Sequence, residues 1–100
     1  MSGALDRARE YGRAIVVEDL GDWGRDELRS EYDPYGPTIR INARVLCALA
    51  TGARAEFIER AVGHELYHHR ERIGEVERLT DRTARERAAD AFAAQLTGSM

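Results

Sequence analysis

The feature that most constrains the fold is one long helical pattern, which covers residues 53–73. Placed at about 100° per residue, five apolar side chains share one half of this helical cylinder: Phe57, Ile58, Ala61, Val62 and Leu66. Gly74 follows directly, in the position where a glycine often ends a helix. So wide an apolar face has to be buried, and we therefore expect the rest of the chain to pack around this helix.

Length and composition indicate a single globular domain, which we expect to span residues 1–100. Hydrophobic residues make up 43% of the chain and charged residues 33%, a balance typical of a folded domain rather than a disordered chain. The longest apolar run, residues 45–50, is far shorter than the roughly 20 residues that a membrane-spanning helix needs. Residues 1–7 lack the apolar segment of a signal peptide, and Cys47 is the only cysteine, so we expect a cytoplasmic protein without membrane partners.

The charge distribution disfavours nucleic acid as a partner. All 15 basic residues are arginines, and the formal net charge is -3 at pH 7. Several arginines alternate with acids, as at Glu71 and Arg72, a pattern typical of solvated helix faces. Such a chain has no overall attraction to a phosphate backbone. Its oligomeric state stays open.

The first half of the chain is predicted to hold a short helix and three strands. The expected elements are a helix at residues 5–11 and strands at residues 14–17, 26–32 and 38–41. Gly12 ends the helix, and a turn built on Pro34, Gly36 and Pro37 separates the last two strands. These strands are expected to form a small, mostly antiparallel three-stranded sheet.

The second half is predicted to be helical. Asn42 is a candidate N-cap for a short helix at residues 43–50, and a last helix is expected at residues 83–96, before Gly98. The packing face of this last helix carries Ala88, Ala89, Phe92, Ala93 and Leu96. The expected fold class is therefore α+β, with the sheet packed on the long helix and on the C-terminal helix.

The chemistry lies on the long helix, where His64-Glu65-Leu66-Tyr67-His68 matches the pattern H-E-x-x-H. The two histidines lie about 40° apart around the helix and one turn apart along it, so both imidazoles can bind one Zn²⁺ at about 2.0–2.1 Å. Glu65 lies about 60–100° away from them, a poor position for a third ligand. It can instead act as the general base on a water at the metal.

The alternative is that His64 and His68 are polar residues at the border of an apolar face, because the pattern fixes only three positions. However, two of only three histidines in the chain fill the motif, and both align with the packing face of the helix. These features favour a metal site, and such a site needs a third ligand.

Glu86 is the candidate for that third ligand, since a catalytic zinc usually has three protein ligands. It follows His68 by eighteen residues, enough for a loop that reverses the chain before the last helix. Asp90, one helical turn later, is placed to accept the outer N–H of a ligand histidine. The alternative is a capping box, in which Glu86 bonds back to the backbone N–H of Thr83.

The H-E-x-x-H segment followed by Glu86-Arg87-Ala88-Ala89-Asp90-Ala91-Phe92-Ala93 resembles the zincin metallopeptidases of the ImmA/IrrE type, which are gluzincin-like. Members of that family carry an H-E-x-x-H helix and then an E-x-x-A-[ND]-x-F-A helix. The similarity is specific over residues 63–96 and loose over residues 38–42, where the family has an edge strand. The resemblance implies a minimal zinc peptidase with Glu86 as third ligand and a peptide or protein as substrate.

The chain also departs from the family pattern. Tyr67 stands where the family commonly has glycine, and the interval between His68 and Glu86 is shorter than in many members. No helix-turn-helix segment is recognisable. The natural substrate therefore does not follow from the resemblance.

The expected substrate edge is the strand at residues 38–41, which can pair with an extended peptide through Thr38, Ile39, Arg40 and Ile41. Tyr67 is expected to narrow the cleft beside it. Candidates for the donor to the tetrahedral oxyanion are Tyr32, Tyr35, Tyr67 and His69. Trp23 is expected to be a core or lid residue.

Two other functions stay open at this point. One is a non-catalytic protein that keeps zinc for structure or for sensing, and the other is a binding module without metal. Glu65 favours catalysis, because a purely structural zinc site gains nothing from a base beside the metal.

Overall fold

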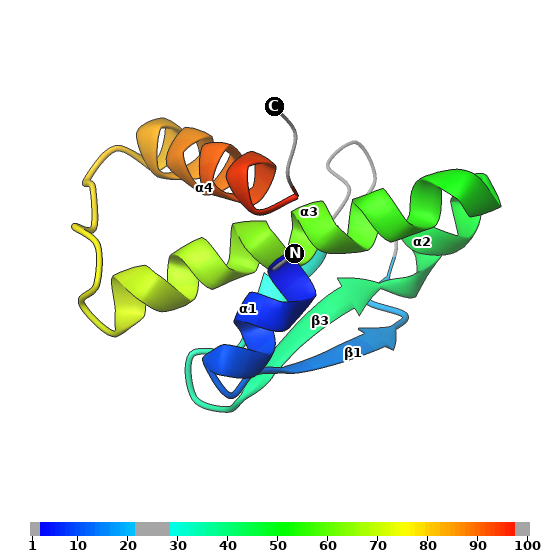
Figure 1. The fold of residues 1–100 in the computed structure, drawn as a ribbon, viewed down its shortest axis with the longest axis horizontal. Helices are drawn as coiled ribbons and strands as arrows, with labels where there is room; N and C mark the ends of the chain where they lie inside the picture. The colour runs from blue at the N-terminus through cyan, green and yellow to red at the C-terminus, as the bar shows by residue number, and fades with distance from the viewer. Residues whose placement is uncertain (1–2, 22–28, 98–100) are drawn as a thin grey trace.

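In the computed structural model, residues 3–21 and 29–97 are described, and they form an α+β fold (Figure 1). In chain order the elements are α1 (Ala4–Glu10), β1 (Ala14–Glu18), β2 (Ser30–Tyr32), β3 (Thr38–Asn42), α2 (Ala43–Ala48), α3 (Thr51–Arg72) and α4 (Arg82–Leu96). The predicted core or lid residue Trp23 lies outside the described residues, as do Gly98 and the first part of the strand predicted at 26–32.

The sheet has the strand order β1-β3-β2, so β3 lies in its centre. β1 pairs with β3 in parallel, with Val16 opposite Arg40, and β2 pairs with β3 antiparallel, with Glu31 opposite the same Arg40. The three predicted strands are present, but the sheet is mixed rather than mostly antiparallel. Residue alternation identifies a strand without identifying its neighbours, and here the chain reverses twice between β1 and β3, so these two strands run in the same direction.

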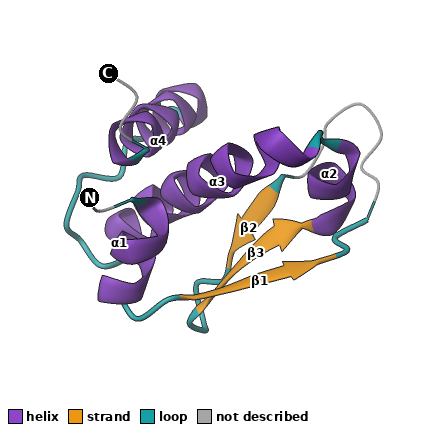
Figure 2. Ribbon diagram, turned by 45° about the vertical axis from the view of Figure 1, so that its right-hand side comes forward, coloured by secondary structure: helices purple, strands orange, loops and turns teal. Residues whose placement is uncertain are grey.

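The centre of the core lies between β3 and α3. Ile39 and Ile41 of β3 are fully buried, as are Val62 and Leu66 of α3. Figure 2 shows α3 crossing one face of the sheet, and Figure 1 shows α4 on the side of α3 away from β3. The long helix is thus covered by the sheet on one side and by α4 on the other, as its wide apolar face requires.

Helices α3 and α4 approach each other closely at Gly63 and Ala93. A Cβ atom built on Gly63 would lie 2.7 Å from the Ala93 Cα atom, closer than real side chains approach. Ala93 is itself buried at this contact. Small residues therefore set the distance between the helices, and this distance brings the acidic side chains of α4 to the histidines of α3.

The residue predicted to begin α2 and the residue predicted to follow α3 both have these roles in the structure. Asn42 caps α2 by accepting a hydrogen bond from the Arg44 N–H at 3.1 Å, and Gly74 adopts a φ of 81° after α3. The predicted helix at 43–50 is shorter in the structure and ends at Ala48, because Leu49 and Ala50 adopt extended backbone before α3 begins at Thr51. Within the described ranges 3–21 and 29–97, none of the helices is long and apolar enough to cross a membrane.

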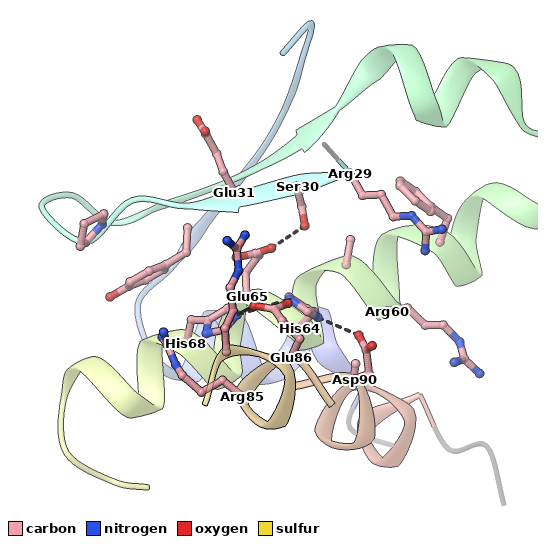
Figure 3. Close-up of a pocket in the computed structure, with 16 residues that line it drawn as sticks. Arg29, Ser30, Glu31, Arg60, His64, Glu65, His68, Arg85, Glu86 and Asp90 are labelled. Atoms are coloured by element: carbon pink, nitrogen blue, oxygen red, sulfur yellow. Dashed lines mark hydrogen bonds and ion pairs between the residues drawn. The ribbon is translucent and has the colours of Figure 1, made fainter. Parts of the chain in front are cut away.

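The start of α4 decides between the two predicted roles of Glu86. Asp81 is the N-cap, and its side chain accepts a hydrogen bond from the Ala84 N–H at 3.0 Å. The capping box predicted with Thr83 as the N-cap is therefore wrong, because the helix begins one residue before Thr83. Glu86 lies a full turn inside α4, and its carboxylate points to α3 (Figure 3).

Candidate metal centre

Three predicted ligands converge between α3 and α4 (Figure 3). The Nε2 atoms of His64 and His68, one turn apart on α3, are 3.3 Å from each other. Glu86 of α4 places Oε2 2.8 Å from the His64 Nε2 atom and Oε1 3.4 Å from the His68 Nε2 atom. The loop between the helices therefore brings together the three side chains that the sequence singled out.

The outer nitrogen of each histidine faces a carboxylate. The Nδ1 atom of His64 is 2.8 Å from Asp90 Oδ1, the contact expected of Asp90, and the Nδ1 atom of His68 is 2.9 Å from Glu71 Oε1. Carboxylates only accept hydrogen bonds, so in the tautomer that binds a metal through Nε2 each Nδ1 atom carries the proton and donates it to its carboxylate. The lone pairs of both Nε2 atoms then point toward each other and toward Glu86.

This arrangement fits a divalent cation. In that tautomer the two Nε2 atoms and the Glu86 carboxylate can all act as ligands of one cation. Two ligands bound at about 2.0–2.1 Å to a tetrahedral zinc are about 3.3 Å apart. The contacts among these donor atoms measure 2.8, 3.3 and 3.4 Å. Two imidazoles and one carboxylate are a donor set of zinc enzymes, in which solvent or substrate completes the coordination.

Glu71 and Arg85 belong to the site, although the sequence did not indicate their roles. The Glu71 side chain is 3% exposed and accepts hydrogen bonds from Arg85 Nε at 3.1 Å and Nη2 at 2.9 Å, besides the one from His68. The hydrogen bonds from Arg85 are the main reason that the pKa of Glu71 is lowered, and His68 adds to the effect. The three-residue spacing from His68 was the available signal, because it places Glu71 on the same helix face.

Glu65 lies beside the ligands and is not one of the converging groups. It is 6% exposed, and its Oε2 atom accepts a hydrogen bond from the Ser30 hydroxyl at 2.6 Å. Burial raises the pKa of the Glu65 carboxyl, while the hydrogen bond from Ser30 and the nearby histidines oppose the rise. This is the position expected of a base rather than a ligand. Nothing in the sequence around Ser30 indicated its contact with Glu65.

A cleft of about 1130 Å³ opens above the candidate ligands. It lies between β2, α3 and α4, and its lining includes Ser30 and Tyr32 from the sheet, Phe57 and Ala61 from α3, and Ala93 from α4. His64, Glu65, His68 and Glu86 all line this cleft. The candidate metal site is therefore accessible to a ligand larger than water.

The predicted substrate edge at residues 38–41 is wrong. β3 pairs on both sides, so its backbone has no free edge, and Ile39 and Ile41 are fully buried. Arg40 instead forms ion pairs at 3.0 to 3.5 Å with three acids of the sheet and its turn: Glu18, Glu31 and Asp33. Thr38 pairs opposite Ala14 of β1. The edge beside the cleft belongs to β2.

Two backbone hydrogen bonds show which residues of β2 direct their N–H and C=O groups toward β3. The Asn42 N–H donates to the Arg29 carbonyl at 2.9 Å, and the Asp33 N–H donates to the Thr38 carbonyl at 3.2 Å. Alternate residues of an antiparallel strand bond to the same neighbour. The backbone groups of Ser30 and Tyr32 therefore point away from β3, toward the free edge.

The side chains predicted as oxyanion donors differ in whether they line the cleft. Tyr67 packs against Phe92, with ring centroids 6.0 Å apart, and is not among the described residues that line the cleft. It therefore does not narrow the cleft as predicted. Tyr35 is 91% exposed at the turn. Tyr32 does line the cleft, and its hydroxyl lies 2.8 Å from the His69 Nδ1 atom.

The chain matches no protein-family model, and it gives no match among curated proteins or solved structures. The functional interpretation therefore depends on the geometry of the cleft and on the residue pattern of α3 and α4.

Proposed function

We propose that this protein is a zinc-dependent peptidase of the zincin type, similar to the ImmA/IrrE metallopeptidases. The observation that carries the proposal is the convergence of His64, His68 and Glu86, with a carboxylate behind each histidine. Glu65, buried beside these ligands and facing the same cleft, supplies the base that hydrolysis needs.

In the proposed reaction, His64, His68 and Glu86 would hold the zinc. When bound, zinc supplies Lewis-acid chemistry that polarises a scissile carbonyl and lowers the pKa of water. Glu65 takes a proton from the attacking water and delivers it to the leaving amine. The hydrogen bond from Ser30 fixes the orientation of the Glu65 carboxylate, and burial raises its pKa, which makes it a stronger base.

The proposed substrate is a peptide in extended conformation along β2. Ser30 and Tyr32 offer outward backbone groups at this edge, and a peptide strand can pair with them next to the zinc ligands. Cys47 as the only cysteine leaves no internal disulfide to maintain, and we propose the cytoplasm as the compartment.

Replacing Glu65 by glutamine tests the proposal. Glu65→Gln is expected to keep zinc, measured by metal analysis of untagged protein, and to lose hydrolysis of a peptide library by about 10²- to 10⁴-fold, the usual contribution of a general base. Glu77→Gln, at an exposed position in the loop after α3, is the matched control and should keep full activity.

Each outcome of this experiment favours one function. Zinc in both variants with no hydrolysis by the wild-type protein would support the non-catalytic zinc protein instead. Protein that binds no zinc at all would support the binding module.

A further inference from the structure

We propose that the cleft selects peptides with an acidic side chain near the scissile bond, and that Arg29 binds this carboxylate. The inference rests on the proposed peptidase function, because it places the peptide along β2. It concerns charge recognition by the cleft wall, whose lining includes Arg29 and Arg60.

Four arginines of the described part of the chain line the cleft, and two of them are paired with other groups. They are Arg29, Arg60, Arg82 and Arg85. Arg85 donates two hydrogen bonds to Glu71, and Arg60 pairs with Glu56 at 3.2 Å. Within residues 3–21 and 29–97, Arg29 and Arg82 have no ion pair. Positive charge is therefore available in the cleft.

Among residues 3–21 and 29–97, each acid that lines the cleft has a polar partner. Glu31 pairs with Arg40 at 3.1 Å, outside the ligand cluster. Glu65 accepts from Ser30, and Glu86 and Asp90 face the histidines. A bound zinc would add two further positive charges. The described lining holds four arginines and four acids, so its charges balance without the metal, and a bound zinc would make the cleft positive although the formal net charge of the chain is -3.

Arg29 has the better position of the two available arginines. It directly precedes Ser30, the residue that holds Glu65, and it lies at the start of the free β2 edge. In Figure 3, Arg29 and Arg60 lie on the same side of His64, opposite Arg85. A peptide paired with β2 therefore passes Arg29 within a few residues of the reacting bond. A guanidinium binds a carboxylate through two parallel hydrogen bonds, which selects Asp or Glu over neutral side chains.

A peptide fits this cleft better than a nucleic acid, which would also carry negative charge. The free edge of β2 offers backbone groups that pair with another backbone, and a sugar-phosphate chain cannot complete that pairing. The negative chain as a whole also repels a long polyanion.

The experiment uses zinc-loaded Glu65→Gln protein, so that peptides bind without being cleaved. Its probes are two fluorescent decapeptides, identical except for glutamate or glutamine at one central position, and affinity is measured by anisotropy. We expect the glutamate peptide to bind about five- to tenfold more tightly. A second substitution, Arg29→Gln, should abolish this preference and leave the zinc content unchanged. Arg29→Glu should reverse the preference, so that a third decapeptide with lysine at the same position binds more tightly than the glutamate peptide. The matched control is Arg78→Gln, in the loop after α3, which should leave the affinities for all three peptides unchanged.

Equal binding of the two peptides, or no binding of either, would overturn the proposal. A glutamate preference that survives Arg29→Gln would overturn the assignment to Arg29. Tighter, Arg29-dependent binding of a single-stranded oligonucleotide would overturn the peptide as ligand. Cleavage by the wild-type protein without any acidic preference would remove this inference and leave the peptidase function standing. An acidic preference in binding without Glu65-dependent cleavage would instead support the role of Arg29 and remove the peptidase function.

Discussion

The imidazole of His68 has a partner at both nitrogens, Glu86 at Nε2 and Glu71 at Nδ1. Glu71 in turn receives two hydrogen bonds from Arg85, which neighbours Glu86 on α4. These bonds lower the pKa of Glu71, so it stays ionised at neutral pH and keeps accepting the proton of His68. Glu71 is therefore a positioning residue for a candidate ligand.

Replacing Glu71 by glutamine is expected to weaken zinc binding by about 10- to 100-fold, the usual effect of losing a carboxylate behind a ligand histidine. The amide keeps the shape of the side chain but removes the charge that binds Arg85. Competition with a chromogenic chelator measures the affinity. Glu56→Gln, on an exposed part of α3, is the matched control. Wild-type affinity in Glu71→Gln would contradict the positioning role.

The candidate ligands and Asp90 could be predicted from helical spacing and the family resemblance, and the contacts that Ser30 and Arg85 make could not. The H-E-x-x-H motif needs only helical spacing, and Glu86 and Asp90 share a face of the next helix. Ser30 reaches Glu65 across 35 residues, and Arg85 reaches Glu71 across 14. No local pattern marks such partners, because they meet only after the chain has folded.

The contact between α3 and α4 limits what the site tolerates at Gly63. In Gly63→Ala, the new methyl group would meet the Ala93 backbone at 2.7 Å, so α4 has to shift. We expect a loss of about 1–3 kcal/mol of unfolding free energy. Zinc affinity should fall as well, since Glu86 and Asp90 both lie on α4. Urea unfolding and chelator competition measure the two effects.

Gly52→Ala is the control for this substitution. Gly52 also lies in α3, but a Cβ atom there meets nothing within 4 Å. Because alanine has the higher helix propensity, this variant should be neutral or slightly more stable. Equal behaviour of the two variants would show that the close approach at Gly63 is unimportant.

At the level of elements, periodicity predicted each helix and strand but not which strands are neighbours. The prediction of a free edge at β3 was wrong because order β1-β3-β2 buries that strand in the centre. Full burial of Ile39 and Ile41 is compatible with a central or an edge strand, so alternation alone could not decide. The free edge beside the cleft belongs instead to β2, a strand of three residues with a weak sequence pattern.

At the level of the whole molecule, polar contacts tie α1 to α3 at two places. The Ala4 N–H donates to Glu59 at 2.6 Å near one end of α1. The Tyr11 hydroxyl donates to Glu75 at 2.5 Å, just beyond the end of α3. These contacts hold the N-terminal segment against the helix that carries the histidines.

The Tyr11 contact predicts a dependence of stability on pH. The hydrogen bond from Tyr11 is the main reason that the pKa of Glu75 is lowered. A carboxyl with a lowered pKa adds stability above its usual pKa of about 4.3, and this is lost as pH falls through the folded value. Tyr11→Phe should therefore lower the Tm of metal-free protein at pH 7, and the difference should shrink below about pH 4. Tyr35→Phe, at a side chain 91% exposed, should change the Tm at neither pH. An equal Tm difference at pH 7 and pH 3 would contradict this account.

Metal removal tests how strongly the candidate ligands couple α3 to α4, because His64 and His68 lie on one helix and Glu86 on the other. Zinc binds the folded arrangement of His64, His68 and Glu86 far better than the unfolded chain, so it should stabilise the fold. At a zinc concentration about 1,000-fold above the Kd, the gain is about 4 kcal/mol. For a domain of this size, that corresponds to a rise in Tm of more than about 10 °C, measured by calorimetry with zinc and with chelator. Glu86→Ala should lose most of the rise and keep the Tm of the metal-free state nearly unchanged, since the Glu86 side chain is 46% exposed and contacts of such exposed groups contribute little. An equal Tm with and without zinc in the wild-type protein would mean that the three side chains do not form a metal site, and the proposed peptidase would fail with it.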